Sequence, residues 1–130
     1  MTKQIPTEAQ EQQLLIQWLK IKKIFYFAPM NENQASFTNR RVAMIQEAKA
    51  KSMGKVKGTC DLFVFTKNGL LGVELKRRPK RLKSGKFSVS HTKTSKEQIQ
   101  FIDAMNGYDF AHSKVCYGFE NAKAFIEEFI

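Results

Sequence analysis

The dipeptide Asn68-Gly69 constrains the fold of this chain more than any other local feature. It separates two runs of strand-like composition, Cys60 to Thr66 and Leu70 to Lys76. Asn-Gly between such runs is the strongest short-range signal of a β-hairpin, because both residues tolerate the positive φ angles of a tight two-residue turn. We therefore expect an antiparallel strand pair in the middle of the chain.

The same turn predicts the register of the hairpin. If Asn68 and Gly69 are the two loop residues, Phe63 faces Glu74 and Asp61 faces Lys76. Asp61, Glu74 and Lys76 then share one face of the sheet. A slip of one residue would move Asp61 away from Glu74. The opposite face is a continuous apolar surface that a helix can cover, and it consists of Leu62, Val64, Leu71, Val73 and Leu75.

Helix and strand signals flank the hairpin on both sides. Thr7 with Gln10 and Ser95 with Gln98 have the spacing of a capping box, which predicts two helix starts. Before the hairpin we expect a helix from Thr7 to about Leu19 that buries Leu14, Leu15, Trp18 and Leu19, a buried strand or extended segment at 24–27, and a helix at 39–52. After the hairpin we expect a helix from Ser95 to Gly107, a strand at 115–117, and a helix from Asn121 that buries Phe125, Ile126, Phe129 and Ile130. This order predicts an α/β sandwich around a mixed sheet.

Length and composition favour one globular domain, residues 1–130. Of the 130 residues, 42% are hydrophobic and 26% are charged, and a chain of this size folds without disulfides or a structural metal. The two cysteines lack metal-ligand spacing and are expected to be reduced. Because the sequence has no apolar run of membrane-spanning length and no signal-peptide pattern, we expect a cytoplasmic protein with no membrane partner.

Positive charge is concentrated in the middle of the chain. The whole sequence has a net charge of +10, whereas residues 40–96 hold 16 basic and three acidic residues, a net charge of +13. Such a field favours a polyanion, most often nucleic acid bound through its phosphates, and a solvated surface is the plain alternative. The candidate DNA contacts are Arg40, Arg41, Arg77, Arg78, Lys80, Arg81, Lys83 and Lys86.

Asp61 and Glu74 form a candidate metal site. The expected register makes them diagonal neighbours with Cα atoms roughly 7 to 8 Å apart, which lets both carboxylates reach one ion. Mg²⁺ takes oxygen ligands and is usually held by one or two carboxylates plus substrate phosphates. Lys76 would orient a water or offset charge on the phosphate. In the alternative interpretation, Asp61 and Lys76 form a cross-strand salt bridge and Glu74 pairs with another cation.

Five short motifs resemble those of the VRR-NUC domain, the virus-type replication-repair member of the PD-(D/E)XK nucleases. The resemblance extends over nearly the whole chain. The motifs are Glu8 to Trp18, Pro29 to Glu32, Gly58 to Asp61, Leu70 to Lys76 and Ser95 to Gln98. Each motif is weak alone, but five in order at compatible spacing are specific. Cys60 departs from the pattern, because the family usually has proline there.

The resemblance implies a PD-(D/E)XK-like αβ sandwich with a Mg²⁺ or Mn²⁺ cofactor. The residues that it assigns to the site are the metal ligands Asp61, Glu74 and Leu75 (through its carbonyl), the catalytic Lys76, the supporting Gln98, and either Glu8 or Glu11 from the first helix. Spacing alone does not separate the two glutamates, and Glu8 is slightly favoured. The basic segment from Arg77 to Lys93 would contact DNA.

The sequence therefore predicts a metal-dependent endonuclease that hydrolyses phosphodiester bonds in branched or duplex DNA, with four-way (Holliday) junctions as the expected substrate. Single-domain members of the family resemble homodimeric junction resolvases, so a homodimer and a phage or prophage source are also implied. Two alternatives stay open. One is a monomeric nicking or flap-type nuclease, and the other is a non-catalytic nucleic-acid-binding module whose acids are structural.

Overall fold

A computed structural model describes residues 5–29, 39–81, 84, 87–88 and 93–130. The mixed α/β class expected from the sequence is confirmed. No helix among the described residues is long and apolar enough to cross a membrane. In chain order, the elements are α1 (Glu8–Lys22), β1 (Tyr26–Phe27), α2 (Arg40–Ser52), β2 (Leu62–Thr66), β3 (Gly69–Lys76), β4 (Lys80–Arg81), β5 (Phe87–Ser88), α3 (Lys96–Asn106), β6 (Ala111–Tyr117) and α4 (Phe119–Glu127).

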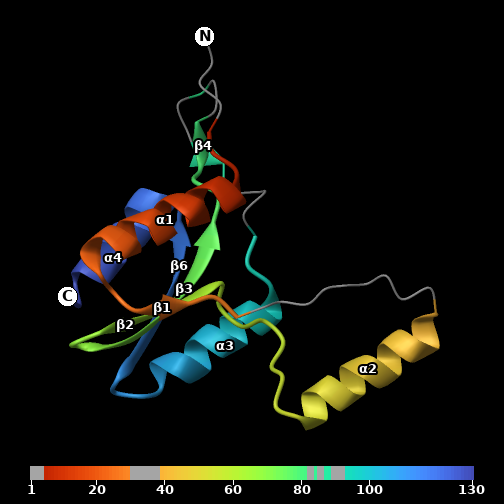
Figure 1. Cartoon of the computed structure of the whole chain (residues 1–130). Helices are drawn as coiled ribbons and strands as arrows, with labels where there is room; N and C mark the ends of the chain where they lie inside the picture. Colours follow the sequence, from red (N-terminus) through yellow and green to blue (C-terminus); the bar gives the residue numbers. More distant parts are fainter. Residues whose placement is uncertain (1–4, 30–38, 82–83, 85–86, 89–92) are drawn as a thin grey trace.

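The main sheet has four strands in the order β1-β2-β3-β6. β1, β2 and β3 are antiparallel neighbours, whereas β6 runs parallel to β3. Figure 1 shows α1 and α4 together on one face of this sheet and α3 on the other, while α2 lies apart from these layers. No residue of α2 is buried. A separate two-stranded sheet pairs β4 with β5.

The hairpin turn lies one residue earlier than the sequence predicts. Thr66 pairs with Gly69, so Lys67 and Asn68 form the loop. Among these residues only Gly69 has a positive φ, at +145°, and Asn68 does not adopt the positive φ that an Asn-Gly loop requires. The Thr66 hydroxyl donates a hydrogen bond to the Gly69 carbonyl at 2.7 Å, which closes the turn.

This turn shifts the strand register by two residues. Phe63 pairs with Gly72, and not with Glu74 as predicted. Because side chains alternate between faces with a period of two, a two-residue shift keeps every side chain on its expected face. The predicted apolar face is accordingly confirmed: it is buried in the main core, where the residues are Leu62, Val64, Leu71, Val73 and Leu75.

The helices on the core face bury much of what the sequence predicts. Leu15, Trp18 and Leu19 of α1 are buried, but Leu14 is 40% exposed and was wrongly assigned to the core. The same correction applies to Ile130, which is 51% exposed. Leu14 lies at the margin of the buried stripe of α1, whereas Ile130 lies beyond the end of α4 at Glu127. α4 contributes Ala122, Phe125 and Ile126 to the core.

Element ends differ from the predictions by a few residues. β6 begins at Ala111, because its pairing with β3 continues through residues that lack a strand pattern. α4 begins at Phe119, and Asn121 is already inside it, where its side chain accepts a hydrogen bond from the Tyr117 N–H at 2.9 Å. The aromatic run 24–27 forms only a two-residue edge strand, and Phe25 is 68% exposed, so the expectation of a buried strand was wrong there.

Candidate active site

Asp61 and Glu74 meet at the open end of the hairpin. Leu62 pairs with Val73, and the same register continued by one residue places Asp61 directly opposite Glu74. The Leu75 N–H donates a hydrogen bond to Asp61 Oδ2 at 2.8 Å, which fixes the aspartate against β3. The two predicted metal ligands are therefore closer than the diagonal arrangement that the sequence suggested.

Glu74 and Lys76 are joined by Gln98. The Gln98 Nε2 donates to Glu74 Oε1 at 2.7 Å, and Lys76 Nζ donates to Gln98 Oε1 at 3.2 Å. Lys76 Nζ also lies 3.5 Å from Glu74 Oε1. Glu74 is 1% exposed and Lys76 is 8% exposed. Lys76 thus contacts Glu74, and no Asp61–Lys76 salt bridge forms among the described residues.

The N-terminus of α3 holds Gln98 in place. Gln98 Oε1 accepts a hydrogen bond from the Ser95 N–H at 2.9 Å, and Ser95 Oγ accepts one from the Gln98 N–H at 3.2 Å, so the predicted capping box is confirmed. The loop before Asp61 packs against this turn at Gly58, which has φ +86°. A Cβ at Gly58 would lie 2.4 Å from the carbonyl carbon of Glu97, so only glycine permits this approach.

Glu74 carries an unsatisfied carboxyl oxygen. Its Oε2 atom is buried and has no hydrogen-bond partner among the described residues. Burial raises the pKa of Glu74 to about 8, the negative charge of Asp61 acts in the same direction, and Lys76 opposes both. An orphaned buried oxygen beside a second carboxylate is costly in a structural role and is what a bound cation would relieve.

The structure separates the two glutamates of α1. Glu8 is an exposed residue whose pKa is raised, first by the loss of water around its carboxyl and then by the charge of Asp61, while Lys76 lowers it. The charges of Asp61 and Lys76 therefore reach the Glu8 carboxyl. Glu11 is fully buried, and Arg78 holds it through two hydrogen bonds, Nε to Oε2 at 3.0 Å and Nη2 to Oε1 at 2.6 Å.

Sequence reasoning missed the cluster around Glu11. Burial alone would raise the pKa of Glu11, but the hydrogen bonds and charge of Arg78 outweigh it, so the pKa is lowered, and the backbone of Phe119 adds to this effect. Gly118 permits the contact, because its φ is +93° and a Cβ there would lie 2.6 Å from Glu11 Oε2. Its N–H donates to the Lys76 carbonyl at 2.8 Å. A glycine between a strand and a helix was the available signal.

The predicted DNA-contacting residues are spread over several places. Arg77 donates hydrogen bonds to the carbonyls of Ile5 and Pro6, both at 2.8 Å, and Arg78 is bound to Glu11. Arg40 and Arg41 are exposed at the start of α2. Of the remaining predicted DNA contacts, Lys80 and Arg81 form β4, whereas Lys83 and Lys86 lie outside the described residues. Asn31 and Glu32 of the Pro29 to Glu32 motif also lie outside them.

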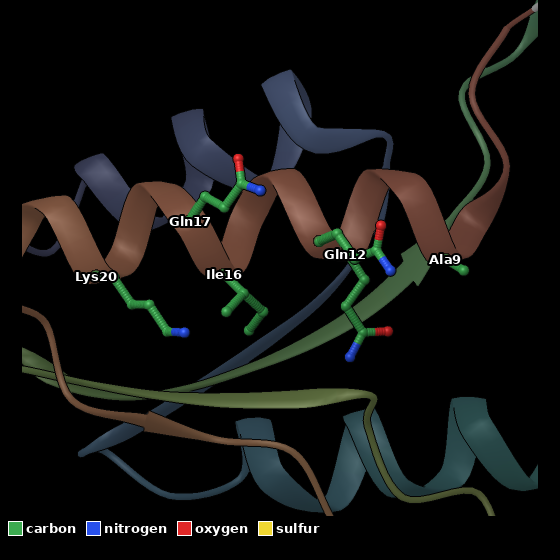
Figure 2. A pocket seen from close by; sticks show the side chains of 6 residues that line it. Ala9, Gln12, Ile16, Gln17 and Lys20 are labelled. Carbon is green, nitrogen blue, oxygen red and sulfur yellow. The ribbon is translucent and has the colours of Figure 1, made fainter.

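A hollow of about 440 Å³ runs along α1 beside the site. Figure 2 shows Gln12, Ile16 and Lys20 projecting from the same side of the helix, over the strands below it. The described residues that line it include no acid. We assign the chemistry to the hairpin end, where the acids lie.

The donor set at the hairpin end suits a hard cation. Asp61 and Glu74 supply two carboxylates, and the main chain of β3 supplies carbonyl oxygens. Among the residues that the structure describes, no group of three or more His, Cys, Asp or Glu side chains is arranged to hold a metal. Two carboxylates fit Mg²⁺ or Mn²⁺, which retain water and accept phosphate oxygens, better than a metal that needs four protein ligands.

Comparison with known proteins identifies the fold. No protein-family model matches the chain, and no curated protein sequence matches it. Among solved structures, the chain is similar to a VRR_NUC domain protein, with a TM-score of 0.68 and 18% sequence identity over 98% of this chain and 91% of that chain. The chain thus has the α/β fold of a VRR_NUC domain, which confirms the fold that the sequence motifs implied.

Proposed function

We propose that this protein is a metal-dependent endonuclease that hydrolyses phosphodiester bonds in DNA. The observation that carries the proposal is the buried, unpartnered Oε2 of Glu74 beside Asp61 and Lys76. Buried carboxylates with a structural role are normally satisfied by hydrogen bonds, so this exception indicates a functional site. The name of the structural neighbour, VRR_NUC domain protein, supports a nuclease.

Asp61, Glu74 and the main-chain carbonyl of Leu75 would hold Mg²⁺ or Mn²⁺. These are hard oxygen donors, and a cation there would relieve the burial and the repulsion that raise the pKa of Glu74. When bound, the ion would supply Lewis-acid polarisation of a phosphate oxygen and a water of lowered pKa. Glu8 of α1 would add a nearby negative charge and not a third metal ligand, and Glu11 is held by Arg78.

Lys76 is the residue that we propose contacts the reacting phosphate. Gln98 and Glu74 hold its ammonium in place, so its positive charge is already positioned before a phosphate binds. Such a charge stabilises the extra negative charge that develops on a phosphate during hydrolysis. Gln98 acts as a positioning residue, because it holds both Lys76 and Glu74.

DNA is the proposed substrate because of the charge distribution. The net charge of +13 over residues 40–96 surrounds the site in sequence, and phosphate neutralisation by Lys and Arg dominates affinity for DNA. We propose branched DNA, with four-way junctions first, and a homodimer that presents two sites to a two-fold substrate. We also propose that it acts in the cytoplasm of a cell that carries a phage or prophage, where the free thiols of Cys60 and Cys116 stay reduced.

A second candidate function is flap-type cleavage by a monomer. It is favoured by aromatic rings that are exposed on the same sheet face as Asp61, because unpaired bases stack on such rings. This candidate uses the same catalytic residues and differs only in the DNA structure that is cut.

Cleavage of labelled DNA tests the proposed function. The purified protein is incubated with four-way junction, flap and plain duplex DNA, with and without Mg²⁺ or Mn²⁺, beside Glu74→Ala, Lys76→Ala and the control Glu127→Ala on the exposed surface of α4. We expect metal-dependent cutting that the two site variants lose and the control keeps. Tight binding without cutting under either metal would favour the non-catalytic module. Cutting retained by both site variants would contradict our choice of residues.

A further inference from the structure

A row of aromatic rings lies on the same sheet face as the candidate site. Side chains alternate along β2, so Phe63 and Phe65 lie on the face that carries Asp61. On β1, Phe27 pairs with Phe63, and the carbonyl of Phe25 accepts the Phe65 N–H. Phe25, Phe27, Phe63 and Phe65 are termed the aromatic strip.

The rings of the aromatic strip touch one another, and all but Phe63 face solvent. Phe27 stacks on Phe63 and Phe25 meets Phe65 edge to face, each with ring centroids 5.1 Å apart. Phe25, Phe27 and Phe65 are 68%, 45% and 43% exposed, whereas Phe63 is buried against Phe101 of α3. The opposite face of these strands is covered by the main core. Contiguous exposed aromatic surface of this kind marks a binding site.

An apolar hollow extends the aromatic strip beneath α3. Its volume is about 300 Å³, and its walls include Phe63, Phe101, Tyr108 and Phe110. Tyr108 and Phe110 are 60% and 63% exposed at its mouth. Phe63 belongs to both the hollow and the strip, so the two form one surface that begins two residues from Asp61.

The charges around the aromatic strip favour a polyanion over an apolar protein partner. Residues 12–30 and 62–73 contain no Asp or Glu. Lys20, Lys22 and Lys23 precede Phe25 closely, and Lys67 follows Phe65 by two residues, all four of them exposed. Exposed rings with lysines nearby in the sequence suit single-stranded nucleic acid, since rings stack on bases and lysines contact phosphates.

We propose that the aromatic strip is a stacking platform for unpaired nucleotides of the strand that enters the site at Asp61. Two residues of a strand advance by about 6.8 Å, so Phe63 and Phe65 lead away from Asp61 in steps of that length. Bases inside a duplex are already stacked on their neighbours and are not available to the rings. The platform therefore deepens the proposed function, on which it rests for its substrate, by selecting branched DNA with an unpaired arm.

Binding in EDTA tests the platform without catalysis. Fluorescence anisotropy compares a twelve-nucleotide oligothymidylate, the matching oligouridylate and a duplex of equal length. We expect Phe25→Ala and Phe65→Ala each to weaken single-strand binding about 5- to 100-fold, the loss that follows removal of one stacked base, with duplex binding unchanged. The two oligonucleotides distinguish DNA from RNA as the source of the unpaired bases. Met53→Ala, at a residue that is 79% exposed after α2, is the control and leaves every affinity unchanged.

Two further substitutions separate base stacking from apolar association. Phe65→Trp keeps a stacking ring and is expected to bind single strands at least as tightly as wild type, with quenching of its fluorescence. Phe65→Leu keeps apolar area without a ring and is expected to bind as weakly as Phe65→Ala. Sedimentation velocity is run on each protein. A wild-type dimer that Phe65→Ala converts to monomer, with single-strand affinity unchanged, would overturn the platform and identify the strip as an interface between copies.

The cleavage assay distinguishes failure of the platform from failure of the nuclease. If Phe65→Ala cuts a flap substrate as fast as wild type, and binds single strands equally well, the platform is wrong and the nuclease stands. If single-strand binding depends on the rings but no substrate is cut, the platform stands and the proposed function is wrong. The expected result is slower cutting of the flap by Phe65→Ala with unchanged cutting of a fully paired junction.

Discussion

Two buried glutamates in this protein have opposite surroundings. Glu11 and Glu74 are 0% and 1% exposed. Glu11 receives two hydrogen bonds from Arg78, and its pKa is lowered despite burial. Glu74 has one oxygen without a partner among the described residues, shares its neighbourhood with Asp61, and has its pKa raised to about 8. The two glutamates are thus equally buried, but the pKa of Glu11 is lowered and the pKa of Glu74 is raised.

The difference separates a glutamate whose carboxylate the fold satisfies, Glu11, from one that we propose binds a cation, Glu74. A carboxylate that the chain itself satisfies stabilises the fold, as Glu11 does where α1, the end of β3 and the start of α4 meet. A carboxylate that the chain leaves short of partners destabilises the metal-free protein and gains its partner from a ligand. Matched substitutions of the two residues test this contrast directly.

The largest expected effect is on cleavage. Glu74→Gln removes a proposed metal ligand, and we expect the rate of DNA cleavage to fall about 10²- to 10³-fold or more. Glu11→Gln, measured at a temperature where it stays folded, is expected to remain within a few-fold of wild type. Single-turnover cleavage of a four-way junction and of a flap provides the measurement. Equal losses of cleavage rate in Glu74→Gln and Glu11→Gln would contradict the proposed difference between the two glutamates.

The next effect is on stability and has the reverse pattern. Glu11→Gln removes the charge that Arg78 pairs with, and we expect a loss of about 2–3 kcal/mol in the free energy of unfolding. This is less than for a fully buried pair, because the Arg78 side chain is 39% exposed and can turn to water. Urea unfolding followed by circular dichroism measures it. Glu74→Gln, unfolded in EDTA at neutral pH, is expected to be at least as stable as wild type.

Cation binding gives a smaller effect. Mg²⁺ or Mn²⁺ at ten times its dissociation constant is expected to stabilise the wild-type protein by about 1.4 kcal/mol, since only the folded state holds the site. Glu11→Gln keeps this increment and Glu74→Gln loses most of it. Thermal unfolding across a cation titration, with Na⁺ at equal ionic strength as the control, makes the comparison. An equal gain in the Glu74 variant would place the cation elsewhere.

The last prediction concerns how the free energy of unfolding of the metal-free protein changes over one pH unit. Between pH 4.5 and about 8 the unfolded state ionises Glu74 while the folded state keeps its proton, so stability relative to Glu74→Gln falls as pH rises. The slope is expected to be about 1.4 kcal/mol per pH unit and to vanish above about 8. Glu11 has the opposite effect, because its pKa is lowered in the folded state. The stability that ionised Glu11 contributes is therefore lost as pH falls through the acid range. Urea unfolding in EDTA at several pH values measures both.

Local signals predicted the parts of the fold that depend on neighbouring residues. The capping boxes at Thr7 and Ser95 correctly located the starts of α1 and α3. The alternation along β2 and β3 correctly assigned the two faces of the hairpin. The predicted position of the turn was wrong by one residue. The predicted faces were still correct, because the strand register shifted by two residues. Short-range geometry thus sufficed to bring Asp61 and Glu74 together.

Contacts between distant segments were not predictable in the same way. Arg78 was expected to contact DNA, but a residue 67 positions earlier in the sequence holds its guanidinium. The separation of Glu8 from Glu11 likewise depends on which side of α1 faces the hairpin end, and spacing along a helix does not fix that orientation. Phe25 is 68% exposed beside the edge strand, and a run of aromatic residues does not reveal how much of it the rest of the chain covers.

The double use of Gln98 links activity to the first turn of one helix. This side chain closes the α3 capping box and also holds Lys76 and Glu74. Helix ends open locally at a fraction of the free energy of global unfolding. Each fraying event at Ser95 therefore releases the proposed catalytic lysine while the sheet remains intact. On warming, we therefore expect any catalytic activity to be lost at a lower temperature than the one at which the protein melts, because the position of Lys76 depends on one helical turn as well as on the hydrophobic core.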